Sequence, residues 1–337
     1  VYPFNYGHFR DIIKYMDKIM LGMMVNAIYN MLDEYFVGGL RTSQMGAISV
    51  VYPLGQVVVG LGLLFGNGAA SYLSRLLGKG DKEKANQVAS TALYSSITVG
   101  VIMIIFSMIF LRPILKLLGA TDSIMPYAVT YASIYIVSCI FNVFNVTMNN
   151  IVTSEGAAKT TMLALMAGAI LNIGLDPVFI YVLDMGVAGA AIATAISQII
   201  STLVYLTFVL RKKSIYNFRI KNCTFTKEII SEIFKIGIPT LVFQILTSLS
   251  ISLVNTQARP YGDSVIAGMG AVTRVVSMGS LMVFGFIKGF QPIAGYSYGA
   301  KKFDRLHEAI KTSIIWSTVF CVIYGLILTI FSNGIIS

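Results

Sequence analysis

The residues best suited to chemistry in this sequence are two aspartates that lie inside long apolar stretches. Asn172 and Asp176 are four residues apart in LNIGLDPVFI, so a helix would place them on one face. Asp33 follows Asn26 and Asn30 in another apolar stretch, again at helical spacing. Because an ionisable side chain inside a membrane is costly, it is by default a functional candidate. Two carboxyl groups in one amide-lined pocket could bind protons or a cation as a pair.

The two aspartates are expected at a similar depth. Each lies about seven residues from the end of its apolar stretch, or roughly 10 Å at 1.5 Å per helical residue. Two other interpretations remain open at this point. Asp33 could extend its side chain to the membrane surface, and Asp176 could merely sit beside the helix bend that Pro177 imposes.

Other polar residues recur at helical spacing in the apolar stretches. Amides and hydroxyls at such positions either line a cavity or hold helices together. A buried lysine either reaches into a cavity or extends its ammonium group to the surface. We expect a substrate cavity to be lined from among Asn26, Asn30, Asn145, Asn149, Gln198, Lys288 and Gln291.

The composition indicates that helices crossing a membrane position these residues. The chain has 337 residues, of which 56% are hydrophobic and 12% charged, and its mean hydropathy is +0.76. Soluble domains carry about a quarter charged residues. Apolar segments of about 20 residues favour helices over a β-barrel. We predict an all-α polytopic protein with nine spans, at approximately 19–40, 45–74, 86–111, 123–153, 160–183, 186–210, 229–258, 264–297 and 306–331.

The basic residues indicate the orientation. The net charge is +10, and most lysines and arginines fall at the connections on one side of the predicted spans. The positive-inside rule therefore predicts a multi-pass protein of the plasma (inner) membrane with a cytoplasmic N-terminus. This placement also argues against a nucleic-acid partner.

No enzyme motif is present. The sequence has no nucleophile elbow, no P-loop and no metal-ligand cluster, and its three cysteines match no metal or disulfide spacing. We therefore expect no enzymatic activity and no cofactor, and we expect a monomer surrounded by membrane lipid.

An internal repeat divides the chain. MGAISVV (45–51) resembles MGAVTRVV (269–276), and GKGDKEK (78–84) resembles GAKKFDR (299–305). A parallel repeat of this length is typical of a transporter. We predict an N-terminal lobe at 1–210, a cytoplasmic linker at 211–228 and an incomplete C-terminal lobe at 229–337, which three further helices would complete.

Several motifs together resemble the multidrug and toxic compound extrusion (MATE) family. They are VNAIYNMLDEYFVGGL, GAASYLSRLLGKGDKEKA, NNIVTSEGAAK, LNIGLDPVFIY, GVAGAAIATAISQ and GFQPIAGYSYGAKKFDR, and LDPVFIY and FQPIAGYSYGA are similar to the bacterial DinF-like branch. The resemblance covers essentially the whole chain. It implies twelve helices in two lobes around a cavity that opens alternately to either side, and export of cationic or amphipathic compounds in exchange for H⁺ or Na⁺.

The resemblance also implies roles for individual residues. It assigns cation or proton coupling to Asp33, Asn172, Asp176 and Thr194, and Pro177 offers a helix bend. One departure is YMDKIM at the start of the first span, where relatives have a Pro-containing apolar turn.

Two other functions remain open. A flippase for lipid-linked oligosaccharides, from the same superfamily, would need a cationic cavity, whereas these candidates are acidic or bear amides. A channel would build its pore by oligomerisation and would not need a long repeat within one chain. The sequence therefore favours a secondary active efflux transporter for small, cationic organic compounds.

Overall fold

The computed structural model describes residues 9–40, 42–258 and 263–330, and the statements below concern this part of the chain. The predicted cytoplasmic N-terminus, at residues 1–8, lies outside it. The described residues form helices and connecting turns without a strand, and nine of the helices are long, which confirms the all-α prediction. The long helices are α1 (Phe9–Gly38), α2 (Thr42–Lys79), α3 (Lys82–Ile109), α5 (Met125–Ser154), α6 (Ala158–Pro177), α7 (Gly186–Leu210), α8 (Lys227–Ala258), α9 (Asp263–Gly299) and α10 (Phe303–Ile330).

Several helices extend beyond the predicted spans, and three short elements were not predicted. α2 continues to Lys79, for example, because a helix can run on with polar residues after its apolar part ends. The additional elements are α4 (Leu111–Leu117), a π-helical turn η1 (Val178–Val182) and a 3₁₀ turn η2 (Ile220–Asn222). Elements this short leave no periodic hydrophobic pattern by which they could be predicted.

Seven helices in the described part are long and apolar enough to cross a bilayer: α2, α3, α5, α6 together with η1, α7, α8 and α10. Their outward surfaces carry large apolar side chains that would contact water in a soluble protein. On α10, for example, Ile315, Trp316 and Ile323 are exposed. These features support the prediction of a helical membrane protein.

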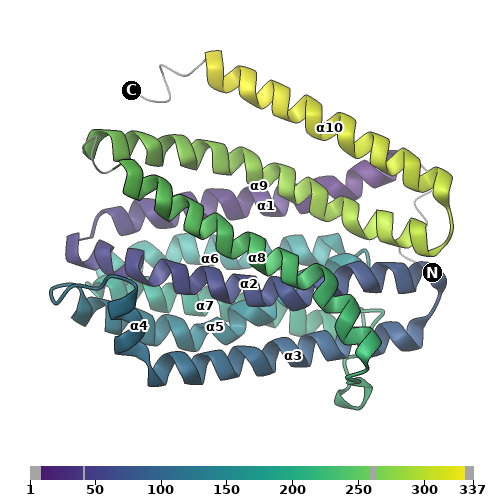
Figure 1. The fold of residues 1–337 in the computed structure, drawn as a ribbon, viewed down its shortest axis with the longest axis horizontal. Helices are drawn as coiled ribbons and strands as arrows, with labels where there is room; N and C mark the ends of the chain where they lie inside the picture. The colour runs from purple at the N-terminus through teal and green to yellow at the C-terminus, as the bar shows by residue number, and fades with distance from the viewer. Residues whose placement is uncertain (1–8, 41, 259–262, 331–337) are drawn as a thin grey trace.

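The helices lie roughly side by side along the long axis of the molecule, with α10 at one edge beside α9 (Figure 1). We call α1–α7 the first helix group and α8–α10 the second. α2 packs against α3 and α5 of its own group and against α8 and α9 of the other, while α1 packs against α6 and α9. The two groups therefore meet mainly along α1 and α2.

The two ends of the bundle differ in how the groups join. We call the end where α2, α7 and α9 finish the linker end, and the other the far end. At the linker end one core cluster contains residues of both groups, such as Leu73 and Ile151 of the first and Ile229 and Ile293 of the second. At the far end the core cluster of described residues around Ile136 belongs to the first group alone. The bundle is thus packed shut at the linker end.

Residues 211–226, the linker, connect α7 to α8. The predicted bounds of this segment were 211–228, and α8 begins two residues earlier than predicted, at Lys227. The linker folds back onto the first helix group. Tyr216 is 4% exposed and belongs to the linker-end core, whereas Phe225 is 66% exposed.

Candidate functional site

Helices α1 and α6 bring the two aspartates together. Asp176 is 0% exposed, and Asn172, one turn earlier, donates from Nδ2 to Asp176 Oδ1 at 3.3 Å. The half-buried Asp33 approaches from α1, close enough for a hydrogen bond between the two carboxyl groups. Since an ionised carboxylate only accepts hydrogen bonds, a hydrogen bond between the two acids would need a proton on one of them. The pair is therefore chemically able to hold a proton.

The helix that carries Asp176 changes its winding directly after it. Pro177 ends α6, and the chain continues as the π-helical turn Val178–Val182. Proline has no N–H to donate, and π-helical turns recur at functional sites. The Tyr181 hydroxyl, from this turn, donates to the backbone carbonyl of Phe36 on α1. The irregular segment is thus attached to the helix that carries the other aspartate.

Three tyrosines near the acid pair were not among the site residues predicted from the sequence. Tyr29 lies within electrostatic range of both aspartates, and Tyr131 and Tyr135 lie within range of Asp33. The Tyr131 and Tyr135 rings stack with their centroids 5.6 Å apart. Spacing offered a signal, because Tyr29 precedes Asp33 by four residues and the other two tyrosines are also four apart.

The remaining predicted residues are more dispersed. Thr194, on α7, and Gln291, on α9, are half-buried. Asn30 is exposed and donates to Asn26 Oδ1 at 3.0 Å within α1. These four residues lie on α1, α7 and α9, whereas Asp176 lies on α6. Their roles in coupling or in a cavity stay predictions.

Asn145 and Gln198 connect α5 to α7. Asn145 Nδ2 donates to the Gln198 backbone carbonyl at 2.9 Å and to Gln198 Oε1 at 2.8 Å. Asn145 Oδ1 accepts from the Thr202 hydroxyl at 2.9 Å. With Asn145 8% exposed, these contacts give it a packing role between helices. A part for Asn145 and Gln198 in a substrate cavity stays a prediction.

Asn145→Ala is expected to lower the free energy of unfolding by about 1–3 kcal/mol. The change removes three hydrogen bonds, which average about 0.6 kcal/mol each between membrane helices, and leaves buried partners unsatisfied. Chemical or thermal unfolding in detergent measures the loss. Thr98→Ala is the control, because that exposed hydroxyl bonds only within its own helix, and an equal loss in both variants would contradict the packing role.

Lys288 joins the two helix groups. Its ammonium group, from α9, donates to Asn149 Oδ1 on α5, and Asn149 Nδ2 donates to the Tyr205 hydroxyl on α7 at 3.1 Å. Asn149 is buried and Lys288 is half-buried. In this arrangement the lysine is held at the contact between the groups, in the half of the bundle nearer the linker end.

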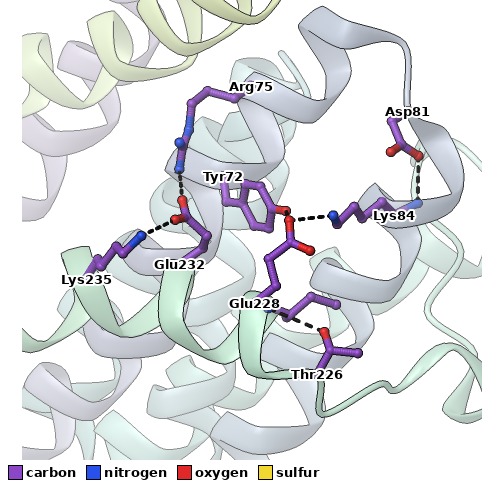
Figure 2. Close-up of polar contacts among 9 residues, drawn as sticks. Tyr72, Arg75, Asp81, Lys84, Thr226, Glu228, Glu232 and Lys235 are labelled. Carbon is purple, nitrogen blue, oxygen red and sulfur yellow. Dashed lines mark hydrogen bonds and ion pairs between the residues drawn. The ribbon is translucent and has the colours of Figure 1, made fainter.

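Charged side chains link the two groups at the linker end (Figure 2). Glu228, on the first turn of α8, accepts from the Tyr72 hydroxyl at 3.0 Å and from Lys84 Nζ at 2.6 Å. One turn later, Glu232 pairs with Arg75 at 2.7 Å and with Lys235 at 2.6 Å. This network was not predicted from the sequence, since its members are far apart in the chain.

Near these ion pairs, at the linker end, glycines let the backbones of α2 and α9 come into contact. A Cβ atom at Gly78 of α2 would overlap the Tyr296 carbonyl oxygen of α9, and one at Gly299 would overlap the Arg75 carbonyl oxygen. Gly78 and Gly299 are the two positions that the internal repeat aligns, GKGDKEK with GAKKFDR. Corresponding residues of the two repeats thus pack on each other.

The described residues contain no group of three or more His, Cys, Asp or Glu side chains that could hold a metal ion. The two aspartates, with the Asn172 amide, form an acidic cluster between α1 and α6, in which Asp176 is buried and Asp33 half-buried.

Comparisons with known proteins agree on one family. The MatE family model matches residues 19–178 and 239–337. The multidrug export protein MepA of Staphylococcus aureus (strain NCTC 8325 / PS 47) is 33% identical over 324 residues, which cover 96% of this chain and 72% of MepA. A crystal structure of MATE in complex with MaD3S superposes with a TM-score of 0.92 at 27% identity, over 96% of this chain and 73% of that one.

One further structural match concerns conformation. An outward-facing structure of a multidrug resistance MATE family transporter of the MOP superfamily has a TM-score of 0.91 to this chain at 27% identity. It covers 96% of this chain and 72% of the other.

Proposed function

Because the chain belongs to the MATE family of membrane transporters, we propose that it exports small, cationic organic compounds by exchange for protons. The relatives named above are transporters, not enzymes. The name of MepA supports multidrug export as the activity. The protein would act as a monomer within the lipid of the cell membrane.

The observation that carries the proposal is the pair formed by the buried Asp176 and the half-buried Asp33. A hydrogen bond between the two neighbouring carboxyl groups would need one proton. Loss of that proton would leave two like charges in a dry site, where they repel each other strongly. The pair would therefore exchange its proton only when the site opens to water. Na⁺ is the alternative coupling ion, and it would replace the shared proton between the carboxylates.

The packing of the two helix groups supports alternating access. The linker end is shut by the core, the ion pairs of Glu228 and Glu232, and the contact of Gly78 with Gly299. We propose that this end faces the cytoplasm, since it carries the basic connections predicted to lie there. The described arrangement would then be open, or ready to open, to the outside. Protonation of the acid pair from outside would release the cargo there.

The membrane potential limits the exchange ratio. One elementary charge crossing 100 mV is worth about 2.3 kcal/mol. Exchange of one monovalent cation for one proton moves no net charge, so the pH difference alone would drive export. Exchange for two protons would add the potential to the driving force, and a pair of acids provides two proton acceptors.

Transport by the full-length protein in proteoliposomes tests the proposal. Vesicles loaded with a fluorescent organic cation would receive either a pH gradient or a Na⁺ gradient of equal size. Export driven by the pH gradient alone is the expected result. Export driven by the Na⁺ gradient alone would show that Na⁺, and not the proton, is the coupling ion. Absence of export under both gradients would contradict the proposed activity.

A further inference from the structure

The linker is held against the first helix group along most of its length. The Asn217 N–H donates to Asn86 Oδ1 at 2.8 Å, and the Tyr94 hydroxyl donates to the Phe218 carbonyl at 3.1 Å. Near the end of the linker, the Thr224 N–H donates to Thr91 Oγ1 at 3.0 Å. A flexible linker that only connects two lobes would not need these hydrogen bonds. The linker is therefore a docked part of the first group, and α8 begins three residues after the last of these contacts.

Glu155 lies under the first part of the docked linker. It follows α5 directly, outside the membrane-spanning segments, and is 2% exposed. Its Oε2 accepts from the Ser214 hydroxyl at 2.8 Å and from the Ile215 N–H at 2.7 Å. Within the described part of the chain, its Oε1 is buried without a hydrogen-bond partner.

Among the side chains that the structure describes, no charged group compensates Glu155. The groups that interact with it are the Ser214 hydroxyl, the backbone N–H groups of Ile215 and Tyr216, and the neutral Tyr216 phenol, whose own hydroxyl contacts Ser154. The basic residues beside it in the chain and in the linker are exposed: Lys159, Arg211, Lys212 and Lys213. An ionised carboxylate in this position is thus desolvated and incompletely bonded, which is costly.

Burial raises the pKa of Glu155 from its ordinary value of 4.5 to about 7, although the hydrogen bonds from Ser214 and the linker backbone act in the opposite direction. When the linker undocks, water reaches the carboxyl group and its pKa returns toward the ordinary value. The docked state therefore binds the proton more tightly than the undocked state. By linkage, docking is strongest at low pH, weakens as the pH rises from about 4.5 to about 7, and is constant above that range.

We propose that Glu155 is a proton-binding site that controls how tightly the linker docks on the first helix group. The protonated side chain is neutral, so its burial with an unpartnered Oε1 costs less than burial of the ionised carboxylate. The ionised side chain favours release of Ser214 and Ile215 to water.

Docking connects this site to the seal between the helix groups. The docked linker positions the first turns of α8, where Glu228 and Glu232 pair with Lys84 and Arg75. If the proposed function holds, an acidified cytoplasm would tighten the seal and slow further entry of protons. A neutral or alkaline cytoplasm would loosen the seal and favour loading of cargo. Linker docking itself does not depend on the proposed function.

Hydrogen–deuterium exchange on the full-length protein in nanodiscs tests the proposal. The measured quantity is the protection factor of peptides that cover residues 214–224, corrected for intrinsic exchange. In the native protein, protection should fall about 20-fold between about pH 5.5 and about pH 7.5. Glu155→Gln, a neutral substitute for the protonated acid, should keep high protection with little change over this range. No gradient or cargo is used, so failure here is distinct from failure of the transport assay.

Two further variants make the test decisive. Asn86→Ala removes a docking contact without a titratable group, so it should lower protection by the same factor at every pH. Ser214→Ala removes a hydrogen bond that lowers the pKa of Glu155, so it should move the transition to higher pH even if Glu155→Gln does not fold. A native protein without pH dependence, a Glu155→Gln variant with full pH dependence, or an unmoved transition in Ser214→Ala would overturn the proposal.

Discussion

Asp176→Asn is expected to abolish export driven by a pH gradient while the protein still folds. The substitution keeps the size of the side chain and an acceptor for Asn172, but it removes the group that exchanges the proton. A gradient of one pH unit can sustain roughly tenfold accumulation of a monovalent cation per proton. We expect the variant to equilibrate the cation to equal concentrations on both sides. Asp33→Asn should behave in the same way, because both carboxyl groups share the site.

The measurement is the steady-state ratio of a fluorescent cation across proteoliposome membranes at an imposed pH difference. Asp184→Asn is the matched control, since it makes the same chemical change at an exposed turn shortly after η1. Asp184 has a positive φ of 49°, which asparagine also adopts readily. Native accumulation by both Asp33→Asn and Asp176→Asn would show that the acid pair does not couple transport.

Gly78→Ala and Gly299→Ala are expected to open the linker end. Each added methyl group would overlap a backbone carbonyl of the opposite helix, and a backbone cannot rotate away as a side chain can. Overpacking of this kind costs about 1–3 kcal/mol, which corresponds to a roughly 5–150-fold shift between closed and open states. The Arg75–Glu232 pair is partly exposed, and such pairs contribute only about 0.2–1 kcal/mol. Backbone contact, more than the ion pairs, should therefore decide whether the end is shut.

Labelling of a buried cysteine measures this opening. Ser297 is 0% exposed at the linker end of α9, so Ser297→Cys, with the three native cysteines replaced, should react with a water-soluble maleimide only when the groups separate. The reaction rate should rise in proportion to the open fraction in the two glycine variants. Gly325→Ala is the control, because nothing lies within 4 Å of the added atom. Equal rates in all variants would show that this contact does not seal the molecule.

Much of the fold was predictable because its causes are local. Hydropathy located the nine long helices, and proline placed the irregular backbone directly after Asp176. Hydropathy reports where apolar residues end, however, and not where hydrogen bonding ends, so the predicted spans were often shorter than the helices. α4 was missed because seven residues leave no pattern of their own.

The candidate site was only partly predictable. The type and spacing of Asn172 and Asp176 indicated a functional face, and the depth of Asp33 suggested a partner. The helical spacing of the tyrosines near Asp33 was too weak a signal to separate them from the many other aromatics of the chain, since a tyrosine in an apolar stretch is ordinarily a packing residue. For Asn145 and Gln198, spacing could not distinguish a cavity from a contact between helices.

The sequence by itself determined that this is a helical membrane protein of the MATE family with two acids inside apolar segments, because residue types, hydropathy and motifs are properties of short segments. Only the tertiary structure decided that Asp33 meets Asp176, that Gly78 packs on Gly299, and that the linker docks over Glu155. Each of these contacts joins residues far apart in the chain, so it depends on how helices pack and on where burial replaces water.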